Sequence, residues 1–153
     1  MTQQSVYYVK CSPETLCKNV ADLINHSLDK RMDPQKQTLI KINGNYDRYY
    51  PGSNSSPWFI DALLKSLCDY GFKNLIICEG DLPQFKARDM IVKTKLKPIL
   101  DKYGVSFVDY ENYERDDKEI PWIFRESQLI NNPVPHGHGI AKISCACKNM
   151  LPW

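Results

Sequence analysis

Residues 38–78 read TLIKINGNYDRYYPGSNSSPWFIDALLKSLCDYGFKNLIIC, and this stretch decides the fold. Two short apolar runs, at residues 38–42 and 74–78, have the length and composition of buried strands. Between them a polar, glycine-bearing loop leads to Ser56, which is followed by proline and is a typical helix cap, and Gly71 supplies the left-handed residue that ends the helix. The stretch therefore predicts a strand, a long loop, an amphipathic helix and a second strand.

The same alternation precedes this unit. Residues 5–10, SVYYVK, are rich in β-formers and predict a first strand. Ser12 and Pro13 resemble the cap and first residue of a helix, and apolar residues recur at helical spacing from Leu16 to Leu28. A strand followed by a helix is therefore expected at the start of the chain.

The alternation also continues after residue 78. A helical stretch through Met90 and Val92 is interrupted near Pro98, which opens a second short helix ending at Gly104. Residues 105–110, VSFVDY, predict a further strand. The later segments IPWIF and QLINN fit either a short strand or a helical turn, at residues 120–124 and 128–132.

Strands that alternate with amphipathic helices predict a mostly parallel sheet with helices on both faces. We therefore expect residues 1–153 to form a single α/β domain with a three-layer α/β/α, Rossmann-like architecture. Ligands of such sheets bind beyond the carboxyl ends of the strands. This rule nominates the loop after Lys41, the turn at residues 79–81 and the closing segment from Pro133.

Composition narrows the class of protein. The 20 basic and 18 acidic side chains leave a net charge of +2 without a block of one sign, which favours neither a nucleic-acid partner nor a membrane surface. No segment has the roughly 18 to 20 apolar residues of a membrane span, and the N-terminus does not resemble a secretion signal. Several of the six cysteines fall within strand or helix patterns, so we expect reduced thiols and a cytoplasmic location.

The closing segment offers a possible metal site. His136 and His138 lie in a glycine-flanked loop, and Cys145 and Cys147 would share one face if ISCAC, residues 143–147, were a strand. Four such ligands suit zinc or nickel, and the two histidines alone are a narrower alternative. Against the four-ligand reading, a cysteine in a strand is more often a small core residue.

The loop after residue 41 is a candidate anion site. Lys41 and Asn43 can direct a charge and an amide toward a ligand, and Ser55 belongs to a hydroxyl-rich run at a helix N-terminus. A turn at Asn43 and a plain helix cap explain the same residue types equally well. Tyrosines crowd this loop, and they would either stack on a ligand or close the loop onto the core.

The chain resembles a known family over nearly its whole length. The stretch LIKINGNYDRYYPGSNSSPWFIDALLKSLCDYGFKNLIICEG is similar to the region of domain of unknown function 362 that runs from a lysine-ended strand to a strand ending in Glu-Gly. The segments LKPILDKYGVSFVDY and NNPVPHGHGIAKISCACKNMLPW resemble its later motifs in the expected order. The resemblance implies an α/β domain whose site includes the closing Lys-Asn pair.

Several residues depart from that family's pattern. Ile42 stands where proline is usual, His136 where lysine is usual, and Trp153 where glycine is usual. Family members commonly run on past this point, so the resemblance implies either an N-terminal portion or a shortened member. Some carry iron-sulfur clusters, but no Cys-x-x-Cys-x-x-Cys pattern is present here. The end of the chain is also distantly similar to lactate racemase-like proteins, in which Lys148 would match the lysine that carries a nickel cofactor.

Within the family motif, Lys148 would approach an anionic ligand as a point charge and Asn149 would orient it. Glu79 and the nearby Asp81 would act as a general base or bind metal in the same crevice, although residues of this type are somewhat more often ordinary acidic turn residues. His138, together with Lys148, is the candidate for proton transfer.

Two hypotheses follow. The first is an enzyme or cofactor-binding domain that holds a small anionic metabolite or a metal-linked cofactor at the strand carboxyl ends. The second is a non-catalytic ligand-binding or assembly domain with a degenerate site, favoured by Trp153 in place of glycine. The second would also act through a homo-oligomer or a partner domain.

Overall fold

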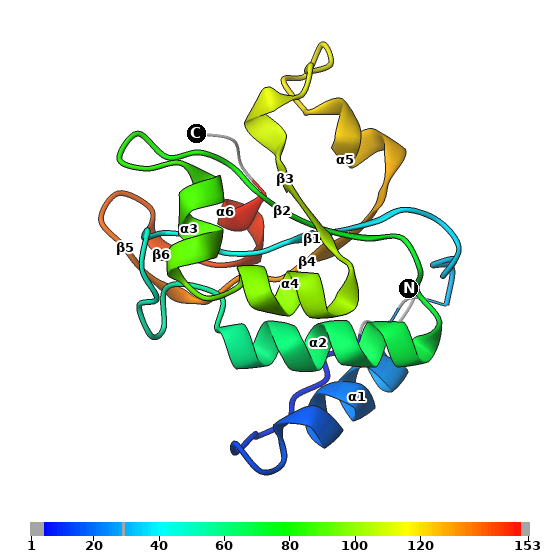
Figure 1. Cartoon of the computed structure of the whole chain (residues 1–153). Helices are drawn as coiled ribbons and strands as arrows, with labels where there is room; N and C mark the ends of the chain where they lie inside the picture. The colour runs from blue at the N-terminus through cyan, green and yellow to red at the C-terminus, as the bar shows by residue number, and fades with distance from the viewer. Residues whose placement is uncertain (1–4, 29, 151–153) are drawn as a thin grey trace.

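The computed structural model describes residues 5–28 and 30–150, which form a four-stranded parallel sheet surrounded by helices (Figure 1). The strand order is β3-β2-β1-β4, so the two central strands are those of the stretch that decides the fold. A separate antiparallel hairpin lies near the end of the chain. The strands span β1 Thr38–Lys41, β2 Leu75–Glu79, β3 Ser106–Asp109, β4 Gln128–Asn131, β5 His136–His138 and β6 Lys142–Ser144.

The helices cover the two faces of the sheet unequally. Four of them pack on one face around the larger core, which includes Ile40, Ile77 and Leu64. The other face carries a smaller cluster of Leu39, Cys78, Tyr110 and Ile123, partly supplied by the fifth helix. The helices span α1 Leu16–Ser27, α2 Pro57–Tyr70, α3 Ala87–Lys93, α4 Lys97–Tyr103, η1 Tyr110–Asn112, α5 Trp122–Glu126 and α6 Ala146–Asn149.

The expected three-layer α/β architecture is therefore confirmed, with a thick layer on one face and a thin one on the other. Both faces of the central strands are covered, because neighbouring residues such as Leu39 and Ile40 belong to different clusters and both are fully buried. This explains why the two strands read as continuous apolar runs rather than as an alternating pattern.

The helices of the central part begin and end where sequence signals predict. Pro57 occupies the first turn of α2, and Gly71 ends it with a positive φ of 105°. Pro98 lies in the first turn of α4, and Gly104 ends that helix with a φ of 64°. Because only glycine adopts this left-handed region without strain, both chain reversals follow from local chemistry.

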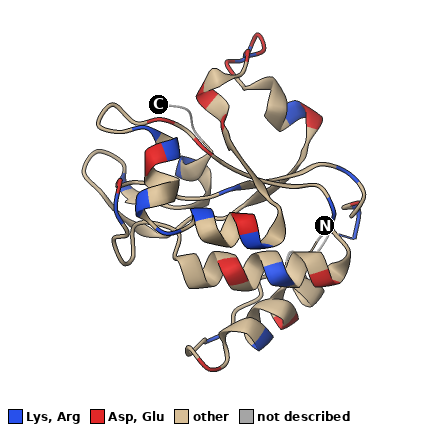
Figure 2. Ribbon diagram, in the orientation of Figure 1, with Lys and Arg blue, Asp and Glu red and all other residues tan. Residues whose placement is uncertain are grey.

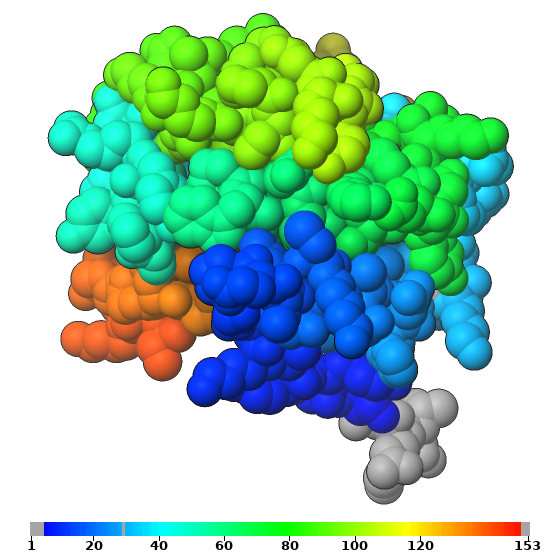
Figure 3. Space-filling model, turned by 60° about the horizontal axis from the view of Figure 1, so that its bottom comes forward, coloured from blue at the N-terminus to red at the C-terminus, as the bar shows by residue number. Residues whose placement is uncertain are grey.

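The predicted strand at residues 5–10 is wrong. The segment forms no sheet pairs, and Val6 and Tyr8 are 94% and 88% exposed. Figure 3 shows it, in dark blue, on the outside of the molecule beside α1, where Lys10 accepts a hydrogen bond from Asn19 Nδ2 at 2.9 Å. The reason lies elsewhere in the chain, because β4 occupies the position beside β1 that a first strand would need. Helix α1 also begins later than predicted, at Leu16, after a turn at Ser12.

The later segments resolve the alternatives that the sequence leaves open. Residues 122–126 form a short helix, whereas residues 128–131 form the edge strand β4. The expectation of a strand through residues 143–147 is wrong, because β6 ends at Ser144 and α6 follows. Cys147 is exposed and Cys145 is half-buried, so neither cysteine packs in the core. Because the strand ends before Cys145, the alternation of side chains along a strand does not place Cys145 and Cys147 on one face.

Charges of both signs are interspersed along α2, α3 and α4 (Figure 2), in agreement with the absence of a one-sign block in the sequence. Within residues 5–28 and 30–150, no helix combines the length and the apolar character that crossing a bilayer requires.

The core makes a direct stability prediction. Ile77 is fully buried in β2, between β1 and β3, so Ile77→Ala should lower the free energy of unfolding by about 2–5 kcal/mol through lost burial and a residual cavity. Urea denaturation measures this change. Val92→Ala, at an exposed site on α3, serves as the control and should change stability by less than about 0.5 kcal/mol. Equal effects of the two substitutions would contradict the assigned core.

Candidate functional site

A buried ion pair joins the ends of the two central strands. Lys41, the last residue of β1, donates from Nζ to Glu79 Oε1 over 2.5 Å, and Glu79 is the last residue of β2. Their side chains are only 5% and 8% exposed. Parallel pairing in register places Lys41 opposite Cys78 and brings the next residue of β2 within reach of the ammonium. The pair therefore lies at the carboxyl edge of the sheet, where this class of fold binds ligands.

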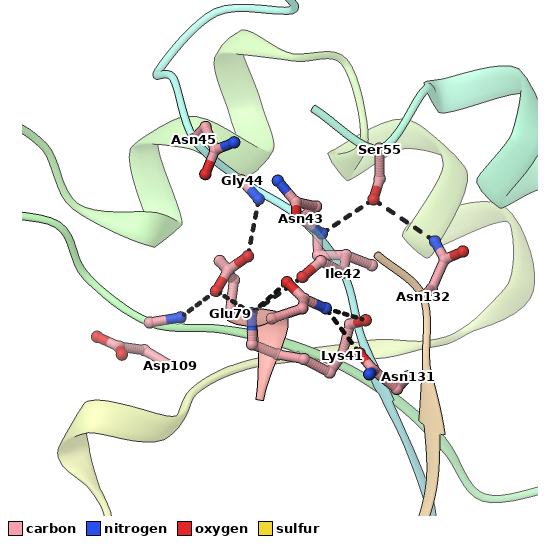
Figure 4. A network of polar contacts seen from close by, with 12 residues as sticks. Lys41, Ile42, Asn43, Gly44, Asn45, Ser55, Glu79, Asp109, Asn131 and Asn132 are labelled. Atoms are coloured by element: carbon pink, nitrogen blue, oxygen red, sulfur yellow. Dashed lines mark hydrogen bonds and ion pairs between the residues drawn. The ribbon is translucent and has the colours of Figure 1, made fainter. Parts of the chain in front are cut away.

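Glu79 also organises two backbone segments, as Figure 4 shows for Gly44. Its Oε2 accepts a hydrogen bond from Gly44 N at 2.7 Å, and its Oε1 accepts one from Gly80 N at 2.9 Å. Glycine is required at both positions because a Cβ atom would not fit, and not because the backbone has a positive φ. A Cβ on Gly44 would lie 2.6 Å from Met90 Cε, and one on Gly80 would lie 2.6 Å from the Tyr110 ring.

Lys41 has further partners that fix its ammonium. Nζ donates to the carbonyl of Ile42 at 3.0 Å and to Asn149 Oδ1 at 3.3 Å, and it lies 5.5 Å from the centre of the Tyr110 ring. The last distance is within the range of a cation–π contact. Burial raises the pKa of the Tyr110 phenol, so this ring stays neutral beside the pair. Lys41 is consequently neutralised and held on several sides.

Asparagines connect the closing segment to this edge. Asn149 Nδ2 donates to Asn131 Oδ1 at 2.8 Å, and Asn131 Nδ2 donates to the carbonyl of Ala146 at 2.9 Å. Asn131 ends β4, whose register places it opposite Lys41. The segment from Ala146 to Asn149 is therefore fastened to β1 and β4 by side chains that the sheet itself positions.

Ile42, which replaces a family proline, keeps a backbone donor. Its N–H donates to the carbonyl of Cys78 at 3.2 Å, which extends the β1–β2 pairing by one residue. Proline has no N–H and would leave this carbonyl without that bond.

The candidate residues from three distant segments line one small polar pocket. Its cavity volume is about 20 Å³, which accommodates about one water molecule. Lys148 lies at this pocket, and its pKa is lowered, first by burial and then by the positive charge of Lys41, while Glu79 acts in the opposite direction. Two ammonium groups and one carboxylate therefore meet at this pocket. That lining comprises Lys41, Asn43, Gly44, Asn45, Glu79, Leu82, Tyr110, Ser144, Lys148 and Asn149.

Asn43 and Ser55 form hydrogen bonds within the loop after β1. Ser55 Oγ accepts from Asn43 N at 2.9 Å, and Asn43 Nδ2 donates to the carbonyl of Ser53 at 2.7 Å. Asn43 still borders the polar pocket, whereas Ser55 lines a different hollow together with Trp58 and Pro133. Ser56 makes no side-chain cap bond to α2, so its predicted capping bond is absent.

The two histidines border a wider cleft beside the pocket. His136 Nδ1 lies 2.7 Å from the carbonyl of Gly137, and its Nε2 lies 2.6 Å from Asn45 Nδ2. Asn45 Nδ2 also donates to the Ser53 carbonyl, so the arrangement fits a neutral His136 with the proton on Nδ1. His138 Nδ1 accepts from the backbone N–H groups of Ile140 and Ala141, at 3.2 and 3.1 Å.

These residues do not fit the metal that the sequence suggests. Both nitrogens of His136 already face hydrogen-bond partners, and Nδ1 of His138 accepts two backbone donors. In the described part of the chain, no three His, Cys, Asp or Glu side chains gather as metal ligands require. The two histidines and two cysteines are therefore not brought together as a four-ligand site.

A pair of carboxylates lies at the adjoining strand ends. Burial raises the pKa of Asp109, which ends β3, and the neighbouring Asp81 adds to this rise. Asp81 is itself partly buried, but bonds from Lys86 and the N–H of Ala87, with a contribution from Asp109, bring its pKa below the usual value. Asp81 thus holds the start of α3 rather than facing the pocket.

Sequence reasoning did not name four members of the site individually. Gly44, Gly80, Tyr110 and Asn131 complete the surroundings of the ion pair, although Gly80 lies in the nominated turn and Asn131 in the closing family motif. Their shared signal was position, because each stands at or just after the carboxyl end of a strand.

The fold and this edge define the class of protein, a parallel α/β domain with a charged polar site at the carboxyl ends of its strands. The chain belongs to the family described as Domain of unknown function (DUF362), whose model matches residues 38–153. The search of curated proteins gave no match, and neither did the search of solved structures, so the more distant similarity to lactate racemase-like proteins is not supported. Trp153, one of the departures from the family pattern, lies outside the described residues.

The buried ion pair leads to a testable prediction about stability. Lys41→Met leaves Glu79 buried without its cation and should lower the free energy of unfolding by about 3–5 kcal/mol. Lys65→Met, which removes a solvent-exposed pair with Asp69, is the matched control and should cost no more than about 1 kcal/mol.

Urea denaturation of Lys41→Met, Glu79→Gln and the double variant measures the coupling between the two positions. The double variant should lose less stability than the two single losses combined. Additive losses would show that the two side chains do not depend on one another.

Proposed function

We propose that this domain binds a small anionic ligand, through a carboxylate or phosphate group, at the carboxyl ends of β1 and β2. One observation carries the proposal: Lys148 brings a second ammonium to a pocket where Glu79 already neutralises Lys41. The Lys148 ammonium is partly desolvated there, and it attracts an anion more strongly than it would in water because the local dielectric is low.

The roles divide between the two lysines. Lys41 is engaged with Glu79, Asn149 and the backbone, so it shapes the pocket and does not meet the ligand as an open charge. Lys148 meets the anion as a point charge. Asn43 and Asn149 border the same pocket, and their fixed side chains form the polar wall that orients the anion.

A catalytic role extends this proposal to an enzyme. The lowered pKa of Lys148 brings its amine closer to neutral pH, where a lysine can exchange a proton with a bound substrate. His138 borders the adjacent cleft, where its imidazole would serve a substrate too large for the pocket. Lys148 and His138 are the residues we assign to proton transfer.

A second candidate is a non-catalytic ligand-binding or assembly domain. The observation that favours it is the completeness of the Lys41, Glu79, Asn131 and Asn149 network, which by itself explains why these side chains are buried. In that case the network fastens the closing segment, and homo-oligomer formation or a partner domain supplies the function.

We infer a cytoplasmic location for this activity. All six cysteines, at positions within the described residues, are free thiols, which is the usual state in a reducing compartment. The ligand is a small molecule, and neither nucleic acid nor a membrane is among the proposed partners.

The binding proposal is tested with sulfate as the probe. Lys148→Met should weaken sulfate binding about tenfold to a hundredfold, the equivalent of a charge-assisted hydrogen bond of about 1.5–3 kcal/mol. Titration calorimetry measures the affinity. Lys73→Met removes an exposed lysine that precedes β2, at the opposite end of the sheet, and should leave it unchanged. Sulfate binding that is equally weak in the wild type and in Lys148→Met would refute the proposal.

The pH dependence gives an independent prediction. The Lys148 ammonium loses its proton as the pH rises through its lowered pKa. As the pH is raised, the sulfate affinity should therefore begin to decline before pH 10.5, the ordinary pKa of lysine, is reached. Lys148→Arg retains its charge and should keep the affinity over the same range. Sulfate itself does not change charge between pH 7 and 10, so titrations across that range isolate the protein group. Equal losses in the wild type and in Lys148→Arg would assign the effect to another residue.

A further inference from the structure

The cleft beside the polar pocket has the size of a site for a larger molecule. Its volume is about 840 Å³, within the roughly 300–1,000 Å³ of typical small-molecule sites. The pocket alone, at about 20 Å³, has room for little more than one oxygen atom. The two volumes therefore suit different parts of one ligand.

The cleft and the pocket share a wall. Asn45 and Leu82 line both, so the cleft lies directly outside the pocket that contains Lys148. Asn45 is held from two sides, by Ser53 and by His136. The boundary between the two spaces is consequently well positioned, and a ligand that fills the cleft lies next to the pocket that Lys148 lines.

Aromatic and apolar side chains dominate two sides of the cleft. Tyr46 and Tyr50 come from the loop after β1, and their rings lie 5.2 Å apart at 41°. Leu82, Pro83 and Phe85 come from the loop after β2. These flat and apolar surfaces are suited to a planar ring, which gains stacking energy on tyrosine faces.

The side chains of the two tyrosines are exposed and are not part of the buried core. Tyr46 and Tyr50 are 49% and 57% exposed, so they do not close the loop onto the core. Their backbone is nevertheless anchored, because Asn54 Nδ2 donates to the Tyr46 carbonyl at 2.8 Å and Ser53 N donates to the Tyr50 carbonyl at 3.1 Å. An ion pair of 2.8 Å between Asp47 and Lys93 fastens the same loop to α3. A pre-positioned aromatic pair loses little entropy when a ring stacks on it.

We propose that the ligand carries a flat aromatic body joined to a terminal carboxylate or phosphate. One oxygen of the anion occupies the water-sized pocket next to Lys148, and the ring lies in the cleft against Tyr46 and Tyr50. The inference rests on the proposed anion site and adds to it the class of molecule that the site recognises.

The test compares anions with and without a ring. Acetate and 2-naphthoate form the carboxylate pair, and inorganic phosphate and adenosine monophosphate form the phosphate pair. In at least one pair the aromatic member should bind the wild-type protein at least fivefold more tightly, since stacking contributes about 1–3 kcal/mol, or roughly fivefold to a hundredfold. The pair that shows the gain identifies the anionic group.

Variants locate the effect. Tyr50→Ala should reduce the affinity for the aromatic anion at least fivefold and leave that for the small anion unchanged, whereas Tyr50→Phe should retain both. Tyr113→Ala removes a similarly exposed tyrosine outside the cleft and should change neither affinity. Because Tyr50 is largely exposed, its loss should leave the urea midpoint of the protein unaltered.

Each outcome separates this inference from the anion proposal. If both rings add nothing while sulfate binding still depends on Lys148, the ligand class is overturned and the anion site stands. If 2-naphthol or adenosine binds as tightly as its anionic counterpart, with no effect of Lys148→Met, both the anion site and the joined ligand are overturned. An aromatic gain that Tyr50→Ala does not diminish overturns the placement of the ring in this cleft.

Discussion

The buried ion pair between Lys41 and Glu79 is the constraint on which the carboxyl edge of the sheet depends. Two charges withdrawn from water are tolerated only if each is paired and its remaining hydrogen bonds are satisfied. Glu79 meets this condition with two backbone N–H groups, and Lys41 with a carbonyl and Asn149. The loops after β1 and β2 and the closing segment must therefore all be in place for either charge to be buried.

This requirement divides the site into two parts. The inner part consists of Lys41, Glu79, Asn131 and Asn149, whose contacts with one another are complete. The outer part consists of Lys148, which is partly desolvated at the polar pocket, and of the adjoining cleft with its exposed tyrosines. The two parts meet at Asn45 and Leu82, which line both the polar pocket and the cleft.

Local chemistry predicted the central part of the fold well and the ends of the chain poorly. Strands β1 and β2 and helix α2 are specified by apolar runs, a proline and Gly71, all of which act over a few residues. The segment SVYYVK has equal strand propensity and remains unpaired, because the edge of β1 beside which a preceding strand would lie is not open. That edge of β1 is occupied by β4, from nearly a hundred residues later, a competition that no local pattern reports.

The sequence by itself determined the α/β class, the family, and the rule that any ligand site lies where strands end. It also identified Lys41, Glu79 and Asn149 as members of one crevice, since parallel strands bring their carboxyl ends together. Only the tertiary structure decided that Lys41 and Glu79 neutralise each other, that Lys148 lies at the same pocket and is partly desolvated, and that His136 contacts Asn45. The physical reason is that burial and pairing are properties of three-dimensional neighbours, and these come from residues about 40 to 110 positions apart.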